Sequence, residues 1–433
     1  MSTSAARVSR LVRTTRIATA IIAVVALPAA AQAAPRTFSV VNATELRAAL
    51  LSARVGDTVL LAPGTYGDVN LDRFRFTGGF VNIRSSDPQN RAVFGQMRLG
   101  LASGLSISGI DAQSSLSPVV SASGSNIRFA GNRIRGALPN GDPWDDQQTG
   151  MWVRFASNIV VASNDFQDLR MAIWVQRATS VAIRHNDFTV MREGLNISGA
   201  TRGDIDNNRF EHFSPRYDLG EHPDAIQFWT RNETSGVSRY RIRNNFLSFG
   251  HDGHVQGIFL GNEDINLPHS NLDVSGNIYY GSSFHGISLG MVNDSRIFNN
   301  IVVSSPWADI NNTSFRSADG RKGGGMPPTI ALGVGSNVQT FGNAATHFRG
   351  TSDTRTITDS IDVWETHWRR GEPWTNLLAA RPTARNPGVE EFVTAPTTVA
   401  ATRSIGVLAP FRVGVVTLDP VAAQAFAAAQ PLP

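Results

Sequence analysis

Hydrophobic residues recur in this chain in short patterns that repeat many times. One pattern is an apolar residue, two variable residues, Asn, one variable residue and a second apolar residue, as in Val161–Phe166 and Ile183–Phe188. The smallest interval between copies is 22 residues, from Asn164 to Asn186, and larger intervals fit the same unit with inserted loops. A regular period of this size predicts a repeat architecture. The copies are centred on Asn132, Asn164, Asn186, Asn208, Asn245, Asn277, Asn300 and, more weakly, Asn343.

A second pattern places Gly or Ala before an apolar, a variable and another apolar residue. This alternation predicts strands with one buried face. A unit of 22 residues is too short for a pair of helices but suits three short strands joined by turns, which is one coil of a parallel β-helix. Equivalent strands of successive coils would then stack about 4.8 Å apart. The six copies are Gly150–Val153, Ala172–Val175, Gly194–Ile197, Ala225–Phe228, Gly257–Leu260 and Gly286–Leu289.

The repeated asparagines have a structural explanation. Asn tolerates the left-handed backbone conformation that a tight turn between strands requires. Its amide would also hydrogen-bond the equivalent Asn one coil away. We therefore leave these asparagines out of the candidate catalytic residues.

The first 33 residues have the pattern of a secretory signal, with arginines ahead of an apolar run and a small-residue cleavage site. We expect cleavage after Ala33 and a secreted or periplasmic mature protein. The apolar run is too short to span a bilayer comfortably, and no later segment approaches about 20 uninterrupted apolar residues, so we expect no membrane span. The signal comprises Arg7, Arg10, Arg13, Arg16, the apolar residues 17–27 and the site Ala31-Gln32-Ala33.

The rest of the chain divides in two. Residues 34–348 are predicted to form the β-helix, with an amphipathic helix at Thr44–Arg54 covering the open end of its first coil. Later in the chain the Asn pattern stops, and Pro, Thr and Ala become frequent. Residues 349–433 are predicted to be a tail that packs along the coils or caps the last one. A separate binding module is the alternative.

The predicted N-terminal helix and the segment Gly56–Tyr66 that follows it resemble the opening of many proteins of the pectate-lyase-like β-helix superfamily. Together with the coils, the resemblance covers roughly residues 38 to 345. It implies an all-β fold, a right-handed parallel β-helix, and activity on polysaccharides of the lyase or polygalacturonase type. The patterns are more specific for this fold than for one reaction.

Composition narrows the function. The chain lacks cysteine, which excludes disulfides, thiol catalysis and Cys-ligated zinc. Its net charge is +4 with a single lysine, Lys322, so nearly all positive charge is arginine, which suits bidentate contact with carboxylates. This favours an acidic ligand; the alternative is a genome rich in arginine codons. No basic block argues for nucleic acid, and we expect a monomer whose partner is an acidic polysaccharide.

Aligning the predicted strands gathers ionisable side chains of coils three to six into shared columns. One column is the residue just before each Gly or Ala, and another lies two positions earlier. Such groups are the candidates for acid and base chemistry. The first column holds Thr149, Met171, Glu193, Asp224, Gln256 and His285, and the second holds Gln147, Leu169, Met191, His222, His254 and Ser283. The predicted catalytic residues are His222, Asp224, Glu193, His254 and Arg231.

The direction of two of these side chains depends on where a strand begins. Strict alternation from Ile226 would turn Asp224 and His222 inward, where they would brace a buried turn. Pro223 favours a turn at this place, because it cannot donate to a sheet and restricts the residue before it. The predicted site requires this turn.

Outward positions in the same strands carry flat aromatic side chains beside amides. This combination binds sugars by stacking and by hydrogen bonds to hydroxyl groups. The alternative is that long loops or the tail cover the aromatic residues. The predicted substrate-binding residues are Trp152, Trp174, Arg192, Asn196, Gln227, Trp229, Gln256 and His285.

Three strands resemble the catalytic strands of polygalacturonase-type glycoside hydrolases. Phe284–Gly290 is similar to the Gly-His-Gly strand of that family, and the segments that start at Glu193 and Asp224 resemble its Asp-Gly-Ile strands. In that family these columns carry the catalytic carboxylates and a histidine. The match is partial, because Gln256 intrudes between Asp224 and His285 and the family's Arg-Ile-Lys motif has no counterpart.

β-Elimination on a uronic acid polymer is the reaction we favour from the sequence. His222 or His254 would remove the proton beside the carboxylate, since the only lysine lies in a Gly-rich loop. Arg192 or Arg231 would neutralise the charge that develops. The two predicted catalytic carboxylates would orient the histidine or hold Ca²⁺, although no cofactor is required and no metal site is assigned.

Other functions stay open. In hydrolysis, Glu193 and Asp224 would be the paired carboxylates of a glycosidase. Epimerisation of uronates uses the same proton abstraction as elimination. A glycan-binding β-helix without catalysis is the remaining alternative. The arginine content favours the lyase, because hydrolysis of a neutral glycan would leave the positive charge unexplained.

Overall fold

The computed structural model describes residues 34–249, 254–264, 266–305, 327–363, 365–366, 369–370 and 373–433. The predicted signal sequence and Lys322 lie outside these residues. Residues 35–433 group into one compact unit. No helix among the described residues is long and apolar enough to cross a membrane.

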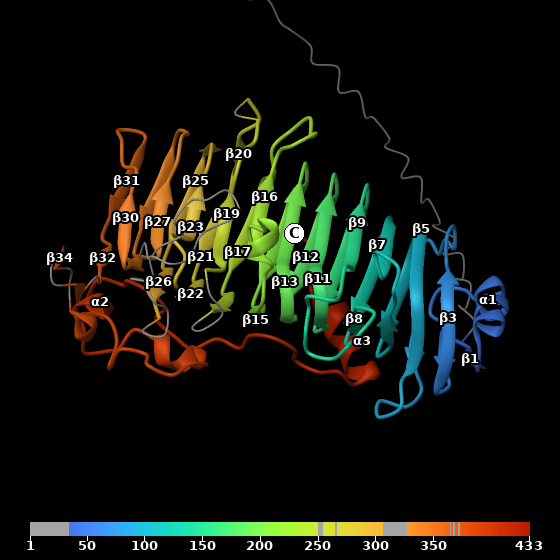
Figure 1. The fold of residues 1–433 in the computed structure, drawn as a ribbon. Coiled ribbons are helices and arrows are strands. Elements are labelled where there is room, and N and C mark those ends of the chain that lie inside the picture. The colour runs from blue at the N-terminus through green and yellow to red at the C-terminus, as the bar shows by residue number, and fades with distance from the viewer. Residues whose placement is uncertain are drawn as a thin grey trace, which may run out of the picture. The chain divides into compact units, whose positions relative to one another are not determined.

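Parallel strands stack coil upon coil in this unit (Figure 1). The strands lie on three faces, and on each face a strand pairs in parallel with the equivalent strand of the next coil, as Val160 does with Ala182, Phe166 with Phe188 and Asn196 with Gln227. This confirms the predicted parallel β-helix. Long strands turn a corner between faces and therefore belong to more than one of them.

The first face contains β1 (Thr37–Val40), β2 (Thr58–Leu61), β4 (Val81–Ser85), β5 (Ala92–Ser108), β7 (Val120–Ala130), β10 (Ser157–Ala162), β12 (Thr179–Arg184), β14 (Thr201–Asp206), β17 (Ser238–Arg243), β20 (His269–Ser270), β21 (Asp273–Ser275), β24 (Val292–Asn293), β25 (Ser295–Phe298), β28 (Val338–Phe341) and β31 (Arg355–Thr358). The second contains β3 (Gly64–Asn70), the first part of β5, β6 (Asp111–Gln113), β8 (Arg133–Arg135), the first parts of β11 (Asp165–Gln176) and β13 (Asp187–Ser198), β15 (Arg209–Phe213), β18 (Phe246–Ser248), β22 (Ile278–Gly281), β26 (Ile301–Ser304), β29 (Ala344–Ala345) and β32 (Ile361–Asp362).

The third face carries most of the predicted site residues. It contains parts of β3, β5 and β7, then β9 (Thr149–Arg154), the later parts of β11 and β13, β16 (Asp224–Trp229), β19 (Gln256–Leu260), β23 (His285–Leu289), β27 (Thr329–Leu332) and β30 (His347–Arg349). Parallel pairing on the second face continues to Ile361–Asp362, past residue 348 where the sequence placed the end of the coils. A separate antiparallel pair is formed by β33 (Glu365–Thr366) and β34 (Arg369–Arg370).

Buried asparagines form a ladder through the coils. Each side-chain amide donates to the Oδ1 atom of the next Asn, at 3.0 Å from Asn164 to Asn186 and at 3.0 Å from Asn186 to Asn208. The same amide also donates to a backbone carbonyl, such as that of Val161. The predicted stacking is therefore confirmed. The ladder consists of Asn132, Asn164, Asn186, Asn208, Asn245, Asn277, Asn300 and Asn343.

The prediction that these asparagines adopt the left-handed conformation is wrong. Positive φ falls instead on the residue before each ladder position, with 56° at Ser163, 53° at His185 and 56° at Asn207. The corner needs one left-handed residue, and placing it before the Asn leaves that Asn free to direct its amide along the stack.

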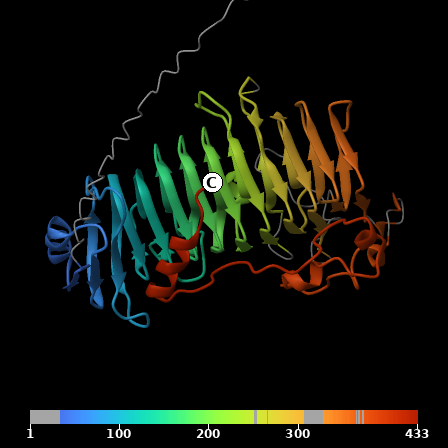
Figure 2. The same cartoon turned by 180° about the vertical axis from the view of Figure 1, so that it is seen from behind.

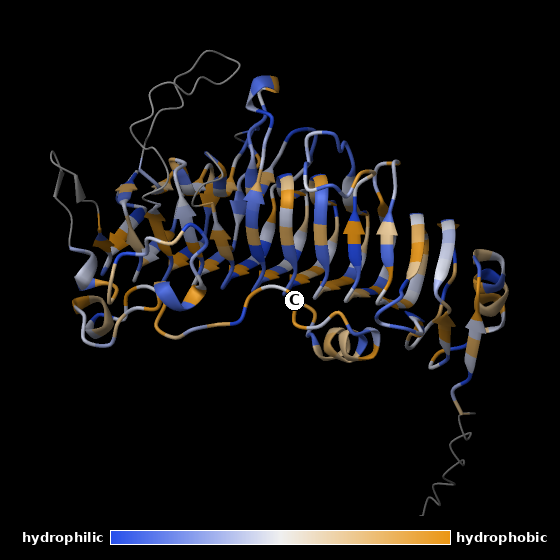
Figure 3. Ribbon diagram, turned by 60° about the horizontal axis from the view of Figure 1, so that its bottom comes forward, coloured by the Kyte–Doolittle hydropathy of each residue, from blue (hydrophilic) through white to orange (hydrophobic). Residues whose placement is uncertain are grey.

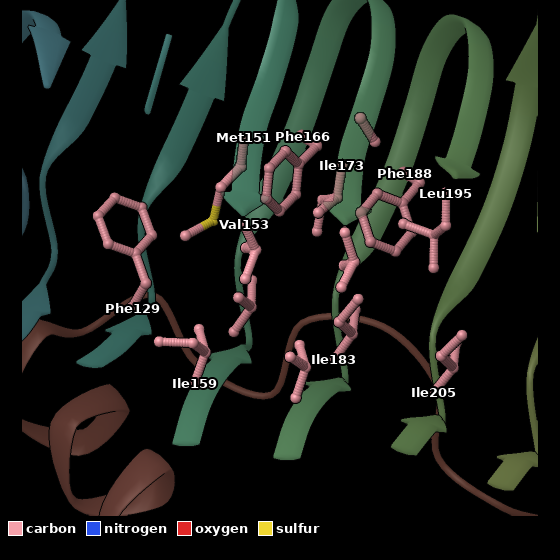
Figure 4. Close-up of a cluster of buried hydrophobic side chains, with 14 of the residues drawn as sticks. Phe129, Met151, Val153, Ile159, Phe166, Ile173, Ile183, Phe188, Leu195 and Ile205 are labelled. Carbon is pink, nitrogen blue, oxygen red and sulfur yellow. The ribbon is translucent and has the colours of Figure 1, made fainter. Parts of the chain in front are cut away.

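The core fills the space between the three faces with apolar side chains in columns (Figure 4). The rings of Phe166 and Phe188 lie 5.2 Å apart, and those of Phe188 and Phe210 lie 4.8 Å apart. Figure 3 shows apolar and polar residues alternating along the strands. This alternation buries one side of each strand and leaves the other side for chemistry.

A helix begins the unit. Helix α1 (Ala43–Ser52) buries Leu46, Ala49 and Leu50 against the first coil, as the amphipathic pattern predicted. The side chain of Asn42 caps it by accepting a hydrogen bond from the backbone N–H of Glu45 at 2.9 Å. This cap covers the apolar end of the stack.

The C-terminal segment runs along the coils (Figure 2). One part packs Leu377 and Phe392 against Tyr280 and Ile301 in a second apolar cluster. Further on, helix α3 (Pro420–Ala429) packs its small residues against Ala130, Val160 and other residues of the first face. The C-terminal segment also contains the shorter helices η2 (Trp374–Asn376), η3 (Val389–Phe392) and α2 (Val399–Thr402). One more short helix, η1 (Tyr217–Leu219), lies outside this segment, between β15 and β16.

Candidate functional site

A change of parity at one corner directs the key side chains outward. In β16, Ala225 and Ile226 are consecutive residues and both belong to the core. Asp224, which precedes them, lines a pocket on the outside of the coil. Strict alternation from Ile226 is therefore broken at Ala225. In β13, Gly194 occupies the place of Ala225, and a Cβ there would lie 2.2 Å from the carbonyl oxygen of Ala225, which explains the glycine.

The pocket has a volume of about 630 Å³ and lies over β11, β13, β16, β19 and β23. A loop before β16, including Leu219 and Gly220, forms part of its wall. The structure brings together here most of the residues that the sequence singled out. The predicted residues that line the pocket are His222, Asp224, Glu193, Arg231, Arg192, Asn196, Gln227, Trp229, Gln256 and His285.

Three predicted residues lie elsewhere. The Nδ1 atom of His254 is 3.3 Å from the backbone oxygen of Ser282 and 3.2 Å from its Oγ atom, and the histidine is not among the residues that line the pocket. Trp152 lines a separate pocket of about 390 Å³. Trp174 lines neither of these pockets. The centroid of its ring is 5.2 Å from that of Trp152 and 5.9 Å from that of Trp229.

Several lining residues were not proposed from the sequence. Arg170 could have been identified from the repeat in the sequence, because the pairing of Met171 with Glu193 makes Arg170 the equivalent of Arg192 on the neighbouring strand. Loop residues such as Glu263 lie outside the repeat, so no sequence pattern pointed to them. The additional lining residues are Arg170, Met171, Leu219, Gly220, Glu221, Pro223, Phe259 and Glu263.

Two carboxyl groups occupy equivalent positions on adjacent strands. Leu195 of β13 pairs with Ile226 of β16, so Glu193 and Asp224, each two residues earlier, correspond. Asp224 is 1% exposed, and neither carboxyl oxygen has a hydrogen-bond partner among the described residues. Burial raises its pKa well above the ordinary range, and the charge of Glu193 raises it further.

Glu193 is shifted in the same direction. Burial raises the pKa of its carboxyl group to about 7, although Asn196 donates a hydrogen bond to its Oε1 atom at 3.1 Å. Because two neighbouring carboxylates repel each other, the pair retains protons near neutral pH. It can therefore donate as well as accept protons in the range where enzymes work.

The arginines at this pocket fall into two kinds. Arg192 is buried and already engaged, with its guanidinium 3.4 Å from Glu221 and donating to Gln147 at 3.1 Å. Arg170 and Arg231 are exposed, and neither forms an ion pair with any residue that the structure describes. Their positive charge is available to an anionic ligand.

The two histidines of the pocket also differ. His285 is held by Ser288, whose Oγ atom lies 2.8 Å from its Nδ1 atom, and by the ring of Phe259 at 5.0 Å. Burial lowers the pKa of His285, and the neighbouring His222 lowers it further. His222 itself is exposed. It is therefore the more accessible base.

Oxygen atoms suited to a hard cation meet in this pocket. The Oδ1 atom of Asn196, the Oε1 atom of Gln256 and both carboxyl oxygens of Asp224 are buried without a hydrogen-bond partner in the described part of the chain. Carboxylate and amide oxygens are the ligands that Ca²⁺ prefers. The described residues contain no group of three or more His, Asp and Glu side chains that could hold a metal. A Ca²⁺ ion would thus need the amide oxygens beside the carboxylates of Glu193 and Asp224.

Comparisons with known proteins agree with the fold. Residues 102–317 match the family model described as "Right handed beta helix region". Together with the parallel pairing, this match confirms the predicted right-handed parallel β-helix and the resemblance to its superfamily. No curated protein matches the chain.

Solved structures of several polysaccharide lyases are similar to this chain at low identity. The PL6 family polysaccharide lyase Pedsa3628 from Pseudopedobacter saltans has 13% identity and a TM-score of 0.48, with 86% of this chain and 100% of that chain covered. A mutant of the PL6 family alginate lyase AlyGC has 15% identity and a TM-score of 0.47, with 75% of this chain and 51% of that chain covered, so the match spans about half of its length. A pectate lyase has 11% identity and a TM-score of 0.35, with 84% and 90% covered.

Proposed function

Because this chain belongs to the right-handed parallel β-helix proteins, whose outer faces can carry extended binding sites, we propose that it cleaves an acidic, uronic-acid-containing polysaccharide by β-elimination. The observation that carries the proposal is the combination, in one pocket, of two exposed arginines without ion-pair partners, Arg170 and Arg231, and a carboxyl pair with raised pKa values. A secreted or periplasmic location, based on the predicted signal sequence, is part of the proposal.

The charge of the pocket suits an anionic substrate. Two ionised carboxylates at its base would repel a uronate, but burial keeps the Asp224 carboxyl protonated and leaves Glu193 half protonated near pH 7. Arg170 and Arg231, which form no ion pair with a described residue, then attract the substrate carboxylate. The site therefore presents positive charge and hydrogen-bond donors.

The residues divide the steps of the reaction among them. His222 removes the proton from the carbon beside the uronate carboxylate. The bond from the next carbon to the leaving oxygen breaks, a carbon–carbon double bond forms, and protonated Glu193 donates its proton to that oxygen. Asp224 and an arginine stabilise the negative charge that builds on the substrate carboxylate. Ca²⁺, when bound to the pocket oxygens, would add positive charge at the same carboxylate.

Hydrolysis is the second candidate, because a specific observation favours it. Glu193 and Asp224 occupy equivalent positions on adjacent strands, which are about 4.8 Å apart. Retaining glycosidases hold their two carboxyl groups about 5–5.5 Å apart, one as acid and one as nucleophile. A pair that shares protons near neutral pH would serve this role.

Product analysis separates the reactions. Purified protein is incubated with polygalacturonate and with alginate, and ultraviolet absorbance from new double bonds is followed in parallel with new reducing ends. Elimination produces both signals, and hydrolysis produces reducing ends alone. Uronate epimerisation changes the sugar composition without either signal. Absence of all three outcomes, with the polymer still bound, would point to a glycan-binding protein.

His222→Ala tests the assignment of the base. We expect the rate of double-bond formation to fall by about 10²- to 10⁴-fold. His254→Ala is the matched control, because His254 does not line the pocket. An equal loss in both variants would contradict the role of His222.

A further inference from the structure

A second pocket lies on the same face of the β-helix, nearer the N-terminus. It has a volume of about 390 Å³, and its lining includes Arg98, Ser121, Trp152, Arg154 and Phe155. It combines aromatic rings with guanidinium groups, as the first pocket does. None of the residues of the proposed chemistry lies in it.

Strand register connects the two pockets. Arg98 pairs with Ser121, Ser121 with Trp152, and Trp152 with Trp174. From there the same row continues through Asn196 to Gln227, which lines the first pocket. Three strand spacings of about 4.8 Å separate Trp152 from Gln227, which amounts to roughly 14 Å. A polymer lying across the strands can therefore reach both pockets.

Aromatic rings bridge this interval. Trp174 lies 5.2 Å from the ring of Trp152, in the second pocket, and 5.9 Å from the ring of Trp229, in the first. All three indole N–H groups are buried without a hydrogen-bond partner among the described residues. A sugar chain offers both stacking surfaces for the rings and hydroxyl oxygens for such donors.

The guanidinium of Arg154 is positioned for an anion. It lies over three rings, 5.1 Å from the centroid of Trp152, 5.6 Å from Phe155 and 5.7 Å from Trp174. It forms no ion pair with a described carboxylate, and its Nε atom is buried without a hydrogen-bond partner in the described part of the chain. Stacking on rings orients the guanidinium while leaving its charge uncompensated.

Arg98 adds a second positive charge beside it. Its one ion pair with a described residue, to Asp72 at 3.5 Å, joins side chains that are 58% and 25% exposed. Such a pair contributes little and is readily displaced by a better-placed carboxylate. The second pocket therefore has two arginines for a carboxylate and two aromatic rings for the sugar that bears it.

We propose that this second pocket is a distal subsite, which binds a uronate residue of the same polysaccharide chain whose cleavage the first pocket performs. The inference rests on the proposed function for the identity of the polymer. It makes the protein prefer long chains over short oligosaccharides, because only a long chain fills both pockets.

Binding measurements test the subsite independently of catalysis. Affinity for polygalacturonate and for alginate is measured by calorimetry in the Asp224→Asn background, so that the polymer stays intact, and again for a trisaccharide of each. We expect Arg154→Gln to weaken polymer binding about tenfold more than trisaccharide binding. Arg47→Gln is the matched control, since Arg47 also stacks on a ring, that of Phe74 at 5.5 Å, but lies on α1.

The outcomes separate the two proposals. Equal affinity of the Arg154→Gln variant and its parent for the polymers, equal weakening by Arg47→Gln, or no binding of either polymer would overturn the subsite. Selective weakening by Arg154→Gln supports it, even if the wild-type protein produces no double bonds. A wild-type protein that binds the polymer but forms no double bonds would refute the lyase proposal and leave the subsite proposal intact. Thermal unfolding midpoints of all variants confirm that each is folded.

Discussion

Two columns of polar side chains run through the same coils and differ in how completely they are hydrogen-bonded. In the Asn ladder, Asn208 donates to Ile183 and Asn245 and accepts twice from Asn186, so its amide is fully used. The other column, the pocket column, consists of the residue just before each Gly or Ala of the repeated strands, namely Thr149, Met171, Glu193, Asp224, Gln256 and His285. There, both carboxyl oxygens of Asp224 have no partner among the described residues. The ladder asparagines are buried, Asp224 is as buried as they are, and both columns repeat once per coil.

The difference indicates which column stabilises the fold and which one acts on a ligand. A buried polar group without a partner costs free energy, so a ladder that satisfies every amide is consistent with a structural role. Unsatisfied groups that open into a pocket are available to a substrate, a proton or a cation. Burial and repetition alone do not distinguish the two columns, but hydrogen bonding does.

The largest expected effect is on activity. Asp224→Asn should lower kcat/KM for the polymer by about 10²- to 10³-fold, because an amide donates a weaker hydrogen bond than the protonated carboxyl group to the charge that builds on the substrate carboxylate, while the free energy of unfolding does not fall. Steady-state kinetics and urea unfolding measure the two quantities. Asp218→Asn is the control, since Asp218 is exposed in the preceding loop and pairs with Arg216. A loss of stability in Asp224→Asn comparable to that of a ladder variant would contradict the comparison.

The second effect is on stability. Asn208→Ala should lower the free energy of unfolding by about 3 kcal/mol, because it leaves buried partners in two neighbouring coils without hydrogen bonds. Urea denaturation measures the change. The control is Asn82→Ala, at a partly buried residue of β4 whose side chain has no hydrogen bond to a described residue, and there we expect a change within about 0.5 kcal/mol. Similar costs at both positions would mean that the ladder bonds contribute no net stability.

The third effect is a pH dependence of stability. Folding raises the pKa of Glu193 from the ordinary 4.5 to about 7, so between these pH values the folded state binds more protons than the unfolded state. The contribution of Glu193 to the free energy of unfolding therefore falls as pH rises from about 4.5 to about 7, by at most about 1.4 kcal/mol per pH unit, and levels off above. Asp224 contributes in the same direction.

Unfolding in urea at a series of pH values measures this slope. Glu193→Gln should flatten it, whereas Asn208→Ala should leave it unchanged, because Asn does not titrate. Repeating the series with excess Ca²⁺ tests the cation site, since a bound cation favours the ionised carboxylates and removes the slope. Burial lowers the pKa values of His185 and His269 to about 4, so these two groups make the free energy of unfolding rise with pH over part of the same range. Subtracting the Glu193→Gln series from the wild-type series isolates Glu193, and a difference that does not fall with pH would refute the assigned shift.

The repeats predicted more of this molecule than the loops did. The repeated strand pattern placed Trp152, Trp174, Asn196 and Gln227 in one row, and the pairing of the strands follows that row. The corner at Ala225, with two consecutive residues in the core, could not be derived from strict alternation.

Positions set by loops were beyond the pattern. His254 follows the repeat in sequence, but its ring lies against Ser282 and not in the pocket. Glu221 and Glu263 line the pocket from segments outside the repeat. Their conformations depend on tertiary contacts, which a periodic pattern does not encode.

The smallest expected effect concerns Gln256, which occupies the pocket column directly beside Asp224 in the strand register. Its Oε1 atom is buried without a partner among the described residues, so Gln256→Ala removes no hydrogen bond of that atom. We expect the free energy of unfolding to change by less than about 1 kcal/mol and KM for the polymer to rise severalfold, because the amide is proposed to contact the substrate. Urea unfolding and steady-state kinetics measure both. If Gln256→Ala destabilised the protein as much as Asn208→Ala, the pocket column would be as structural as the ladder, since removing an unsatisfied amide should cost far less than removing one with four hydrogen bonds.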